Sequence, residues 1–261
     1  MEDLFVYRTI RGRIDLGPIE DAEGRTTNER PRLVKAEDNC EYICKFLDDA
    51  GPEVMGAELI AGAIALGLNL PVPRFAVLHL GRRKAFASLR VADKPVSLRA
   101  GLLERTENVA VVPDLIAFDT FIENRDRKQP GNTIFVRSGI NPEKPYRLYT
   151  IDHSSSGLRF YRAGGEHGIG ADTLNCDGHP LLWDQIRGYD DFHSACERIA
   201  TLGAGELSRI VGRVQEHIGT SQFDGLDQVL LWRAQGIRGL VVRAVERFLG
   251  QRETRKGDEH E

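Results

Sequence analysis

The sequence predicts an α+β protein with a β-rich N-terminal lobe, which carries one main helix, and a mainly helical C-terminal lobe. Three observations support this prediction. Short runs rich in β-branched and aromatic residues, separated by turns, fill most of the first 100 residues. Long amphipathic patterns dominate the second half of the chain. A polar segment at residues 119–152 lies between them and interrupts otherwise apolar sequence.

The N-terminal lobe, residues 1–100, is predicted from its strands. A polar, turn-rich stretch at 24–31 separates the first two strands, and Asp38-Asn39 forms the turn of a hairpin between the second and the third. Gly81 opens the turn between the last two. The five expected strands cover residues 5–14, 32–36, 41–46, 74–80 and 84–91.

One helix is expected inside this lobe, over residues 53–68. Its apolar residues recur with helical spacing, and Pro71 and Pro73 follow its end. The residues that make the pattern are Val54, Leu59, Ile60, Ile64 and Leu68.

The C-terminal lobe, residues 101–250, is expected to be mainly helical. Pro113 opens a first helix, since proline is well tolerated in a first turn. Strands at 133–136 and 147–151 are then expected to form a hairpin. Long helices follow at residues 181–200, 204–217 and 224–249, with Trp183 and Trp232 on apolar faces that predict burial, and a disordered tail is expected at 251–261.

Composition excludes several classes of function. The formal net charge is -4 from interleaved acidic and basic residues, so no basic face for nucleic acid is indicated. No window approaches the ~18 apolar residues of a membrane span, and we expect a cytoplasmic protein. The four cysteines predict no disulfide framework, and Cys176 with His179 lacks the second ligand pair that a structural zinc site needs.

The polar segment carries the candidate chemistry. Asp126 and Asn132 lie in a charged loop between an apolar helix and an apolar strand, and Asp152 follows the next strand. An antiparallel hairpin places its open ends together, so Asn132 and Asp152 are expected side by side. A carboxylate for an attacking hydroxyl and two oxygen ligands for Mg²⁺ is the arrangement that ATP-dependent phosphoryl transfer uses. Taken singly, each residue is more often a surface ion-pairing residue, and it is their combination that favours a site.

Four separated motifs resemble the HipA-like kinases, and within them the small single-domain branch. The resemblance covers roughly residues 20–250, in the right order. It implies a bilobal protein-kinase-like fold, related also to phosphoinositide kinases, that binds ATP and Mg²⁺ between the lobes. The motifs are YICKF, AELIAGAIALGLNLPVP, FDTFIENRDRKQPGN and LYTIDH.

In the N-terminal lobe the resemblance implies three elements of a nucleotide site. Lys45 matches the lysine that contacts the nucleotide phosphates, and Glu58 matches the glutamate that orients it by charge pairing. The phosphate loop is the weakest match, because relatives have Gly-Gly-Ser-type turns there. In this chain the corresponding turn offers the backbone and side chains of Thr26, Thr27 and Asn28.

In the C-terminal lobe the resemblance implies that Asp126 is the catalytic aspartate and that Asn132 and Asp152 bind the metal. Asn124 matches a residue that shapes the loop, and His153 is equally an acid–base group or a structural residue. Ser154-Ser155-Ser156 is interpreted as a turn rather than as a set of autophosphorylation sites. Relatives place the metal asparagine five residues after the catalytic aspartate, whereas here the separation is 132 − 126 = 6. One added residue is expected to bulge outward, with Gln129 as its position.

The function expected on these grounds is ATP- and Mg²⁺-dependent phosphoryl transfer to a protein Ser or Thr. Three alternatives stay open at this point. One is a pseudokinase that binds nucleotide or protein without transfer, the second is a small-molecule kinase, and the third is nucleotidyl transfer. The resemblance also implies a protein substrate and an antitoxin-like partner.

Overall fold

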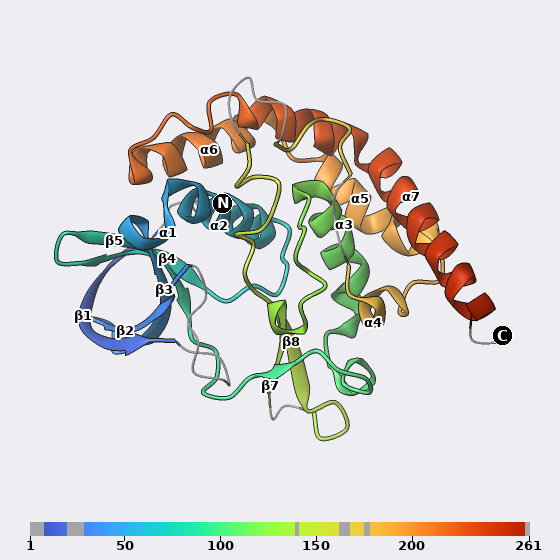
Figure 1. Cartoon of the computed structure of the whole chain (residues 1–261), viewed down its shortest axis with the longest axis horizontal. Helices are drawn as coiled ribbons and strands as arrows, with labels where there is room; N and C mark the ends of the chain where they lie inside the picture. Colours follow the sequence, from blue (N-terminus) through green and yellow to red (C-terminus); the bar gives the residue numbers. More distant parts are fainter. Residues whose placement is uncertain (1–7, 20–28, 139–140, 162–167, 175–177, 259–261) are drawn as a thin grey trace.

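Most of the strands lie in the first 100 residues of the chain and most of the helices after them (Figure 1). The structure is a computed structural model that describes residues 8–19, 29–138, 141–161, 168–174 and 178–258. Its mixed α+β composition agrees with the predicted fold class. The predicted lobe boundary near residue 100 stays a prediction.

The N-terminal strands close into a barrel, with the order β1-β2-β3-β5-β4. Neighbours pair antiparallel, except that β1 closes the barrel by pairing parallel with β4. The buried side chains include several alanines, and small side chains suit the narrow interior of a five-stranded barrel. The strands are β1 (Thr9–Pro18), β2 (Arg32–Ala36), β3 (Glu41–Phe46), β4 (Phe75–Leu80) and β5 (Arg83–Leu89).

All five predicted strands exist, but the sequence pattern did not predict that they close into a barrel. The first strand was expected at residues 5–14. In the structure it ends four residues later than expected, at Pro18. Residues 5–7 lie outside the described part. β1 carries irregular register near Gly12 and Gly17, and an exposed, irregular strand gives a weak alternation signal.

The predicted helix at 53–68 is confirmed as α2 (Pro52–Gly67), which follows the short helix α1 (Leu47–Ala50). α2 is buried continuously from Val54 to Ala65 and packs against both the barrel and helix α6 (Ala204–Ile218). Two of its glycines allow this close approach: a Cβ at Gly56 would meet Phe223 at 2.2 Å, and one at Gly62 would meet Phe75 at 2.7 Å.

Helix α3 begins with Pro113 in its first turn, as predicted, and a small sheet follows it. The sheet has the order β6-β7-β8, and its β7–β8 hairpin confirms the one predicted from the sequence. The elements are β6 (Val96–Ser97), α3 (Val112–Ile122), β7 (Thr133–Arg137) and β8 (Tyr146–Thr150), with 3₁₀ turns η1 (Leu103–Arg105), η2 (Val109–Val111) and η3 (Pro130–Asn132).

The helix predicted at 181–200 is wrong as one element. The structure breaks it at Gly188, because Asp191 accepts hydrogen bonds from the backbone N–H groups of Arg187 and Gly188 and so starts a new helical turn. The predicted helices at 204–217 and 224–249 are present. The observed elements are α4 (Pro180–Trp183), η4 (Tyr189–Phe192), α5 (His193–Ala200), α6 and α7 (Leu226–Asp258).

Helix α7 also runs through most of the segment that was expected to be disordered. Residues 251–258 continue the helix, and 259–261 lie outside the described part. Glutamine, arginine, glutamate and lysine are good helix formers, and extending an existing helix avoids the cost of nucleation. Polar composition alone therefore misjudged this segment.

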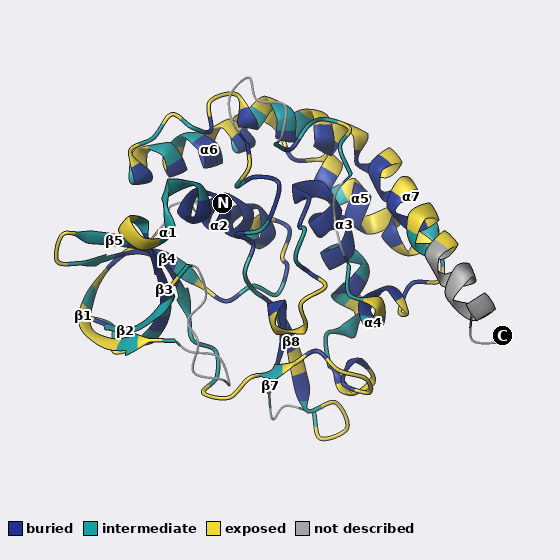
Figure 2. Cartoon of the chain, in the orientation of Figure 1, coloured by how far each residue is buried: buried dark blue, intermediate teal, exposed yellow. Residues whose placement is uncertain are grey.

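Two hydrophobic cores divide the molecule differently from a simple split into N-terminal and C-terminal halves. One fills the barrel, and the other joins α2 to the C-terminal helices (Figure 2). Trp183 belongs to the second core, where it stacks on Phe248 with ring centroids 4.7 Å apart. The expected burial of Trp232 is wrong, since 51% of this residue is exposed on α7.

The described cysteines form no disulfide, in line with the sequence: Cys40 is exposed, while Cys44 and Cys196 are buried thiols. Cys176, half of the weak zinc pattern, lies outside the described residues. His179 has a structural role, because its Nδ1 accepts a hydrogen bond from the Leu181 N–H at the start of α4. None of the helices in the described ranges combines the length and apolar character of a membrane span.

Candidate active site

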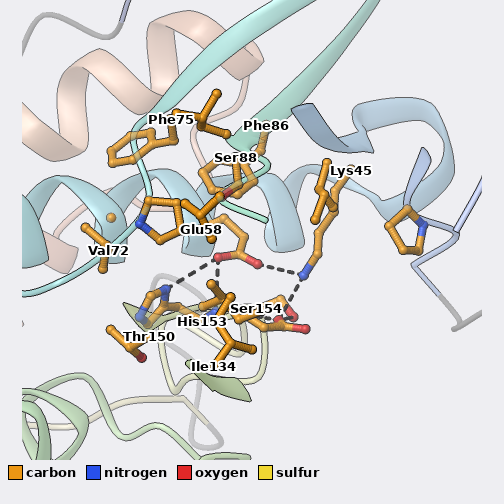
Figure 3. A pocket seen from close by; sticks show the side chains of 18 of the residues that line it. Lys45, Glu58, Val72, Phe75, Phe86, Ser88, Ile134, Thr150, His153 and Ser154 are labelled. Atoms are coloured by element: carbon orange, nitrogen blue, oxygen red, sulfur yellow. Dashed lines mark hydrogen bonds and ion pairs between the residues drawn. The ribbon is translucent and has the colours of Figure 1, made fainter. Parts of the chain in front are cut away.

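A cavity of about 470 Å³ lies where the barrel, α2 and the end of β8 meet (Figure 3). One part of its wall is apolar. The other part carries the charged side chains, of which Lys45 comes from β3, Glu58 from α2 and Asp152 from the segment after β8. The apolar wall consists mainly of Ile43, Val72, Phe75, Phe86 and Ile134.

Lys45 is the centre of the charged part. Only 9% of its side chain is exposed, and its Nζ lies 2.6 Å from Glu58 Oε1, 2.8 Å from Asp152 Oδ1 and 2.6 Å from Glu29 Oε2. The resemblance pairs Lys45 with Glu58, and the structure brings the two side chains into contact (Figure 3). It adds two further carboxylates to the same ammonium group.

In this cluster, charge pairing shifts the pKa values more strongly than burial does. Burial by itself would lower the pKa of Lys45, but the attraction of Glu58, Asp152 and Glu29 outweighs it and raises that pKa. Burial opposes ionisation of Glu58 and Asp152 as well. Lys45 nevertheless holds the pKa of both carboxyl groups below their ordinary values, with help from His153 at Glu58 and from Ser154 at Asp152. Lys45, Glu58 and Asp152 are therefore charged at neutral pH.

His153 and Ser154 hold two of these carboxylates in place. The His153 N–H donates to Glu58 Oε2 at 3.0 Å, and the Phe118 ring packs against the imidazole in an edge-on arrangement. The Ser154 hydroxyl donates to Asp152 Oδ1 at 2.6 Å. The buried position of His153 gives it a positioning role toward Glu58, and the buried Ser154 forms part of the turn that presents Asp152.

Asp152 adopts an uncommon backbone conformation. Its φ is +57°, in the left-handed region that costs energy for a residue other than glycine. The turn directs its carboxylate into the cavity, with 35% of the side chain exposed. Such strain is retained where the surrounding contacts hold it, and here Lys45 and Ser154 provide them.

The loop after α3 places the other two candidate residues. Asn132 Nδ2 donates to Asp126 Oδ2 at 3.1 Å and to the Asp126 carbonyl oxygen at 3.0 Å. Asn124 Oδ1 accepts from the Asp126 N–H at 3.1 Å, as its predicted loop-shaping role requires. The Ile151 N–H donates to the Asn132 carbonyl oxygen, so the hairpin brings the backbones of Asn132 and the residue before Asp152 together.

A buried ion pair supports this loop from beneath. Arg127 Nε lies 2.9 Å from Asp119 Oδ2, and both side chains are almost fully buried. The same guanidinium donates to the carbonyl oxygens of Asn132 and Ile151, while Asn124 Nδ2 donates to Asp119 Oδ1. Asp119 and Arg127 therefore connect α3, the loop and the end of β8.

The extra residue of the loop lies on its outer side. Residues 128–131 are exposed, whereas Arg127 and Asn132 on either side are buried. Backbone bonds from the Gln129 N–H to the Asp126 carbonyl, and from the Asn132 N–H to the Gln129 carbonyl, close the turn. The longer loop thus keeps Asn132 in contact with Asp126, as an outward bulge predicts.

Sequence reasoning missed Glu29, Arg159 and the Asp119–Arg127 pair. Arg159 Nη1 lies 3.2 Å from Glu29 Oε1, and both residues line the cavity. A charged residue inside the apolar pattern FDTFI was the one available signal for Asp119. No pattern marked Glu29 or Arg159. The predicted phosphate-loop residues Thr26, Thr27 and Asn28 lie outside the described residues.

The described chain has a kinase-like fold. The crystal structure of a Helicobacter pylori proinflammatory kinase, CtkA, matches it with a TM-score of 0.52 over 92% of this chain and 99% of that chain. The two sequences are 15% identical, so the likeness concerns the fold. No family model matches the sequence, and no relative was found among curated proteins.

Proposed function

We propose that this protein is an ATP- and Mg²⁺-dependent phosphotransferase of the HipA-like type, acting on a Ser or Thr of a protein. One observation carries the proposal: the buried pair of Lys45 and Glu58 lines the same cavity as Asp126, whose carboxylate accepts a hydrogen bond from Asn132. The kinase-like fold supports the reaction class. The Ser/Thr acceptor and an antitoxin-like partner rest on the sequence resemblance.

The cavity suits a nucleotide in both of its parts. The apolar wall matches the flat, weakly polar face of a base, and Lys45 provides the cation for the phosphates. Glu58 holds the ammonium at 2.6 Å, so the lysine is oriented before ligand arrives. Bound ATP would supply the phosphoryl group to be transferred.

Asn132 and Asp152 are the residues that would hold Mg²⁺. Among the described residues no three His, Cys, Asp or Glu side chains gather into a complete metal site. Mg²⁺ commonly binds through one or two protein oxygens together with substrate phosphates. The exposed part of the Asp152 carboxylate faces the cavity, where the bound ion would neutralise charge on the phosphates.

Asp126 is placed to act on the acceptor. Its carboxylate lines the cavity and keeps Oδ2 fixed through Asn132, while its backbone is fixed by Asn124. A carboxylate held in this way orients an acceptor hydroxyl and accepts its proton as the phosphoryl group is transferred. Most of the rate enhancement would come from positioning.

A nucleotide-binding module without transfer is the second candidate. The observation that favours it is the occupation of Lys45 by three carboxylates, which leaves the ammonium fully engaged. Such a protein would bind nucleotide and leave an acceptor unmodified.

Two measurements test the proposal. Calorimetry should detect ATP binding that requires Mg²⁺, and γ-labelled ATP should label the protein or an added protein acceptor. Asp126→Ala should reduce labelling about a thousandfold with little change in ATP affinity. The surface variant Asp190→Asn is the matched control and should behave as wild type.

Other outcomes identify the alternatives. Binding without transfer in wild type would establish the binding module instead. Label delivered from α-labelled but not γ-labelled ATP would indicate nucleotidyl transfer. A folded wild type that binds no nucleotide would overturn the proposal.

A further inference from the structure

Two cations in the cavity share one carboxylate. The two oxygens of Glu29 face different partners: Oε2 lies 2.6 Å from Lys45 Nζ, and Oε1 lies 3.2 Å from Arg159 Nη1. Lys45 comes from the barrel, whereas Arg159 comes from the segment after β8. The contact therefore bridges the two sides of the cavity.

A phosphate group can bind the same two cations in the same way as the Glu29 carboxylate. Two of its oxygens can face two donors at once, as the two oxygens of Glu29 do here. Arginine and lysine are the side chains that bind phosphate most strongly, arginine through its planar fork of N–H groups. The partly exposed Arg159 side chain lines the same cavity as Lys45, so one ligand can reach both.

The charge balance of the cluster also favours replacement of the Glu29 carboxylate by a polyphosphate. In the structure, Lys45 and Arg159 face the carboxylates of Glu29, Glu58 and Asp152, which gives two positive and three negative charges. Adding a polyphosphate to this cluster would increase an existing excess of negative charge. Release of Glu29 leaves two cations and two carboxylates and makes room for the incoming anion.

Glu29 is the member of the cluster that is easiest to exchange. Glu58 also accepts the His153 N–H and is buried, and Asp152 also accepts the Ser154 hydroxyl. Among the interactions resolved for described residues, the Glu29 carboxylate contacts only the two cations. Its contacts are ionic and can be replaced by those of another anion.

We infer that Lys45 and Arg159 together form one phosphate-binding site, and that Glu29 occupies it as an internal competitor until nucleotide displaces it. This inference rests on the proposed function and extends it to two residues. Arg159 becomes a nucleotide-binding residue, and Glu29 lowers the affinity for nucleotide. Both effects act on the phosphates and leave the base and ribose untouched.

The test compares Mg·ATP with adenosine by calorimetry on the full chain. Glu29→Gln should tighten Mg·ATP binding about tenfold, because it removes the competing charge, and leave adenosine unchanged. Arg159→Gln should weaken Mg·ATP binding about tenfold with adenosine again unchanged. Arg159→Lys, which keeps the charge but loses the fork, should recover part of that loss.

Arg147→Gln and Glu107→Gln are the matched controls. Arg147 pairs with Glu107 at 3.3 Å, and neither residue is part of the cavity wall. Neither change should alter the ratio of the adenosine and Mg·ATP dissociation constants. Thermal unfolding of each variant confirms that the protein is folded.

Each result decides between the two proposals. If wild type binds Mg·ATP and the ratio is the same in Glu29→Gln and Arg159→Gln, the shared phosphate site is wrong while the proposed function stands. Equal loss of adenosine and Mg·ATP binding in Arg159→Gln would show a structural role and also overturn it. If neither wild type nor Glu29→Gln binds Mg·ATP, both proposals fail.

Discussion

The two sides of the cavity are held together in different ways. On the barrel side, Lys45 is surrounded by carboxylates, and the contacts run from side chain to side chain. On the other side, Asp126 lies in a loop that is fixed by hydrogen bonds to the backbone and by the buried Asp119–Arg127 pair.

The ion pairs on the barrel side can therefore change partners, whereas the hydrogen bonds on the loop side keep one arrangement. An ion pair between side chains can exchange one partner for a ligand of like charge, because the other groups keep their places. A loop whose carbonyls are bound to a buried guanidinium keeps its shape before any ligand arrives. The barrel side is thus suited to bind and release an anion, and the loop side to hold a reacting group in a set position.

The largest effect on stability is expected when the loop side of the cavity is disrupted. Arg127→Met leaves Asp119 buried without its cation and removes the donors to the Asn132 and Ile151 carbonyls. We expect the free energy of unfolding to fall by about 3–5 kcal/mol in urea titrations.

The same helix offers the control for this prediction. Asp114, also on α3, pairs with Arg198, but this pair keeps contact with solvent, since 24% of the Asp114 side chain and 41% of the Arg198 side chain are exposed. Arg198→Met should therefore cost less than about 1 kcal/mol. Equal losses for the two variants would mean that burial of the Asp119–Arg127 pair does not stabilise the loop.

The next largest effect is expected on the affinity for Mg·ATP when the barrel side of the cavity is changed. Lys45→Met removes the phosphate contact and should raise the dissociation constant for Mg·ATP between about tenfold and a hundredfold, measured by calorimetry. Lys84→Met is the control, since Lys84 lies in the same barrel but donates to the His217 carbonyl and is not part of the cavity wall. Unchanged affinity in Lys45→Met would contradict the nucleotide site.

A smaller effect is expected when pH changes the stability that the Lys45 cluster contributes. The pKa values of Glu58 and Asp152 are lowered in the folded protein, so the stability they contribute is present above their unfolded values of about 4 and is lost as pH falls through the folded values. The pKa of Lys45 is raised, so its contribution is complete below about pH 10 and is lost only in stronger base. The cluster should therefore stabilise the fold evenly between about pH 5 and 10.

Urea unfolding at a series of pH values from neutral to acid checks this expectation. Asp152→Asn should lose less stability than wild type on acidification, because one of the lowered carboxyl groups is gone. Asp93→Asn is the control, since 88% of the Asp93 side chain is exposed, and its acid response should match wild type. An unchanged acid response in Asp152→Asn would show that the Lys45 contact does not stabilise the fold.

The smallest effect is expected at the bulge of the loop. Gln129 is exposed, and the turn is closed by its backbone N–H and carbonyl rather than by its side chain. Gln129→Ala should change the free energy of unfolding by no more than about 0.5 kcal/mol and leave transfer from γ-labelled ATP near the wild-type rate. A strong loss of transfer would mean that the longer loop does affect the reacting residues.

Local patterns were sufficient to predict most of the elements. The strands, α2, the start of α3 and the β7–β8 hairpin follow from periodicity and from proline and turn residues, which act over a few neighbouring positions. The break at Gly188 and the exposure of Trp232 were not predicted. Both depend on contacts or packing partners that hydrophobic periodicity does not contain.

The sequence by itself determined the α+β class and indicated Asp126, Asn132 and Asp152, because these polar residues lie at the ends of apolar elements. Lys45 and Glu58 were indicated only by the resemblance to a kinase family. Only the tertiary structure decided that the first strands close into a barrel and that α2 joins the C-terminal core. It also decided that Glu29 and Arg159, which are 130 positions apart, meet at Lys45. Long-range charge pairing depends on distance in space, and no local pattern records that distance.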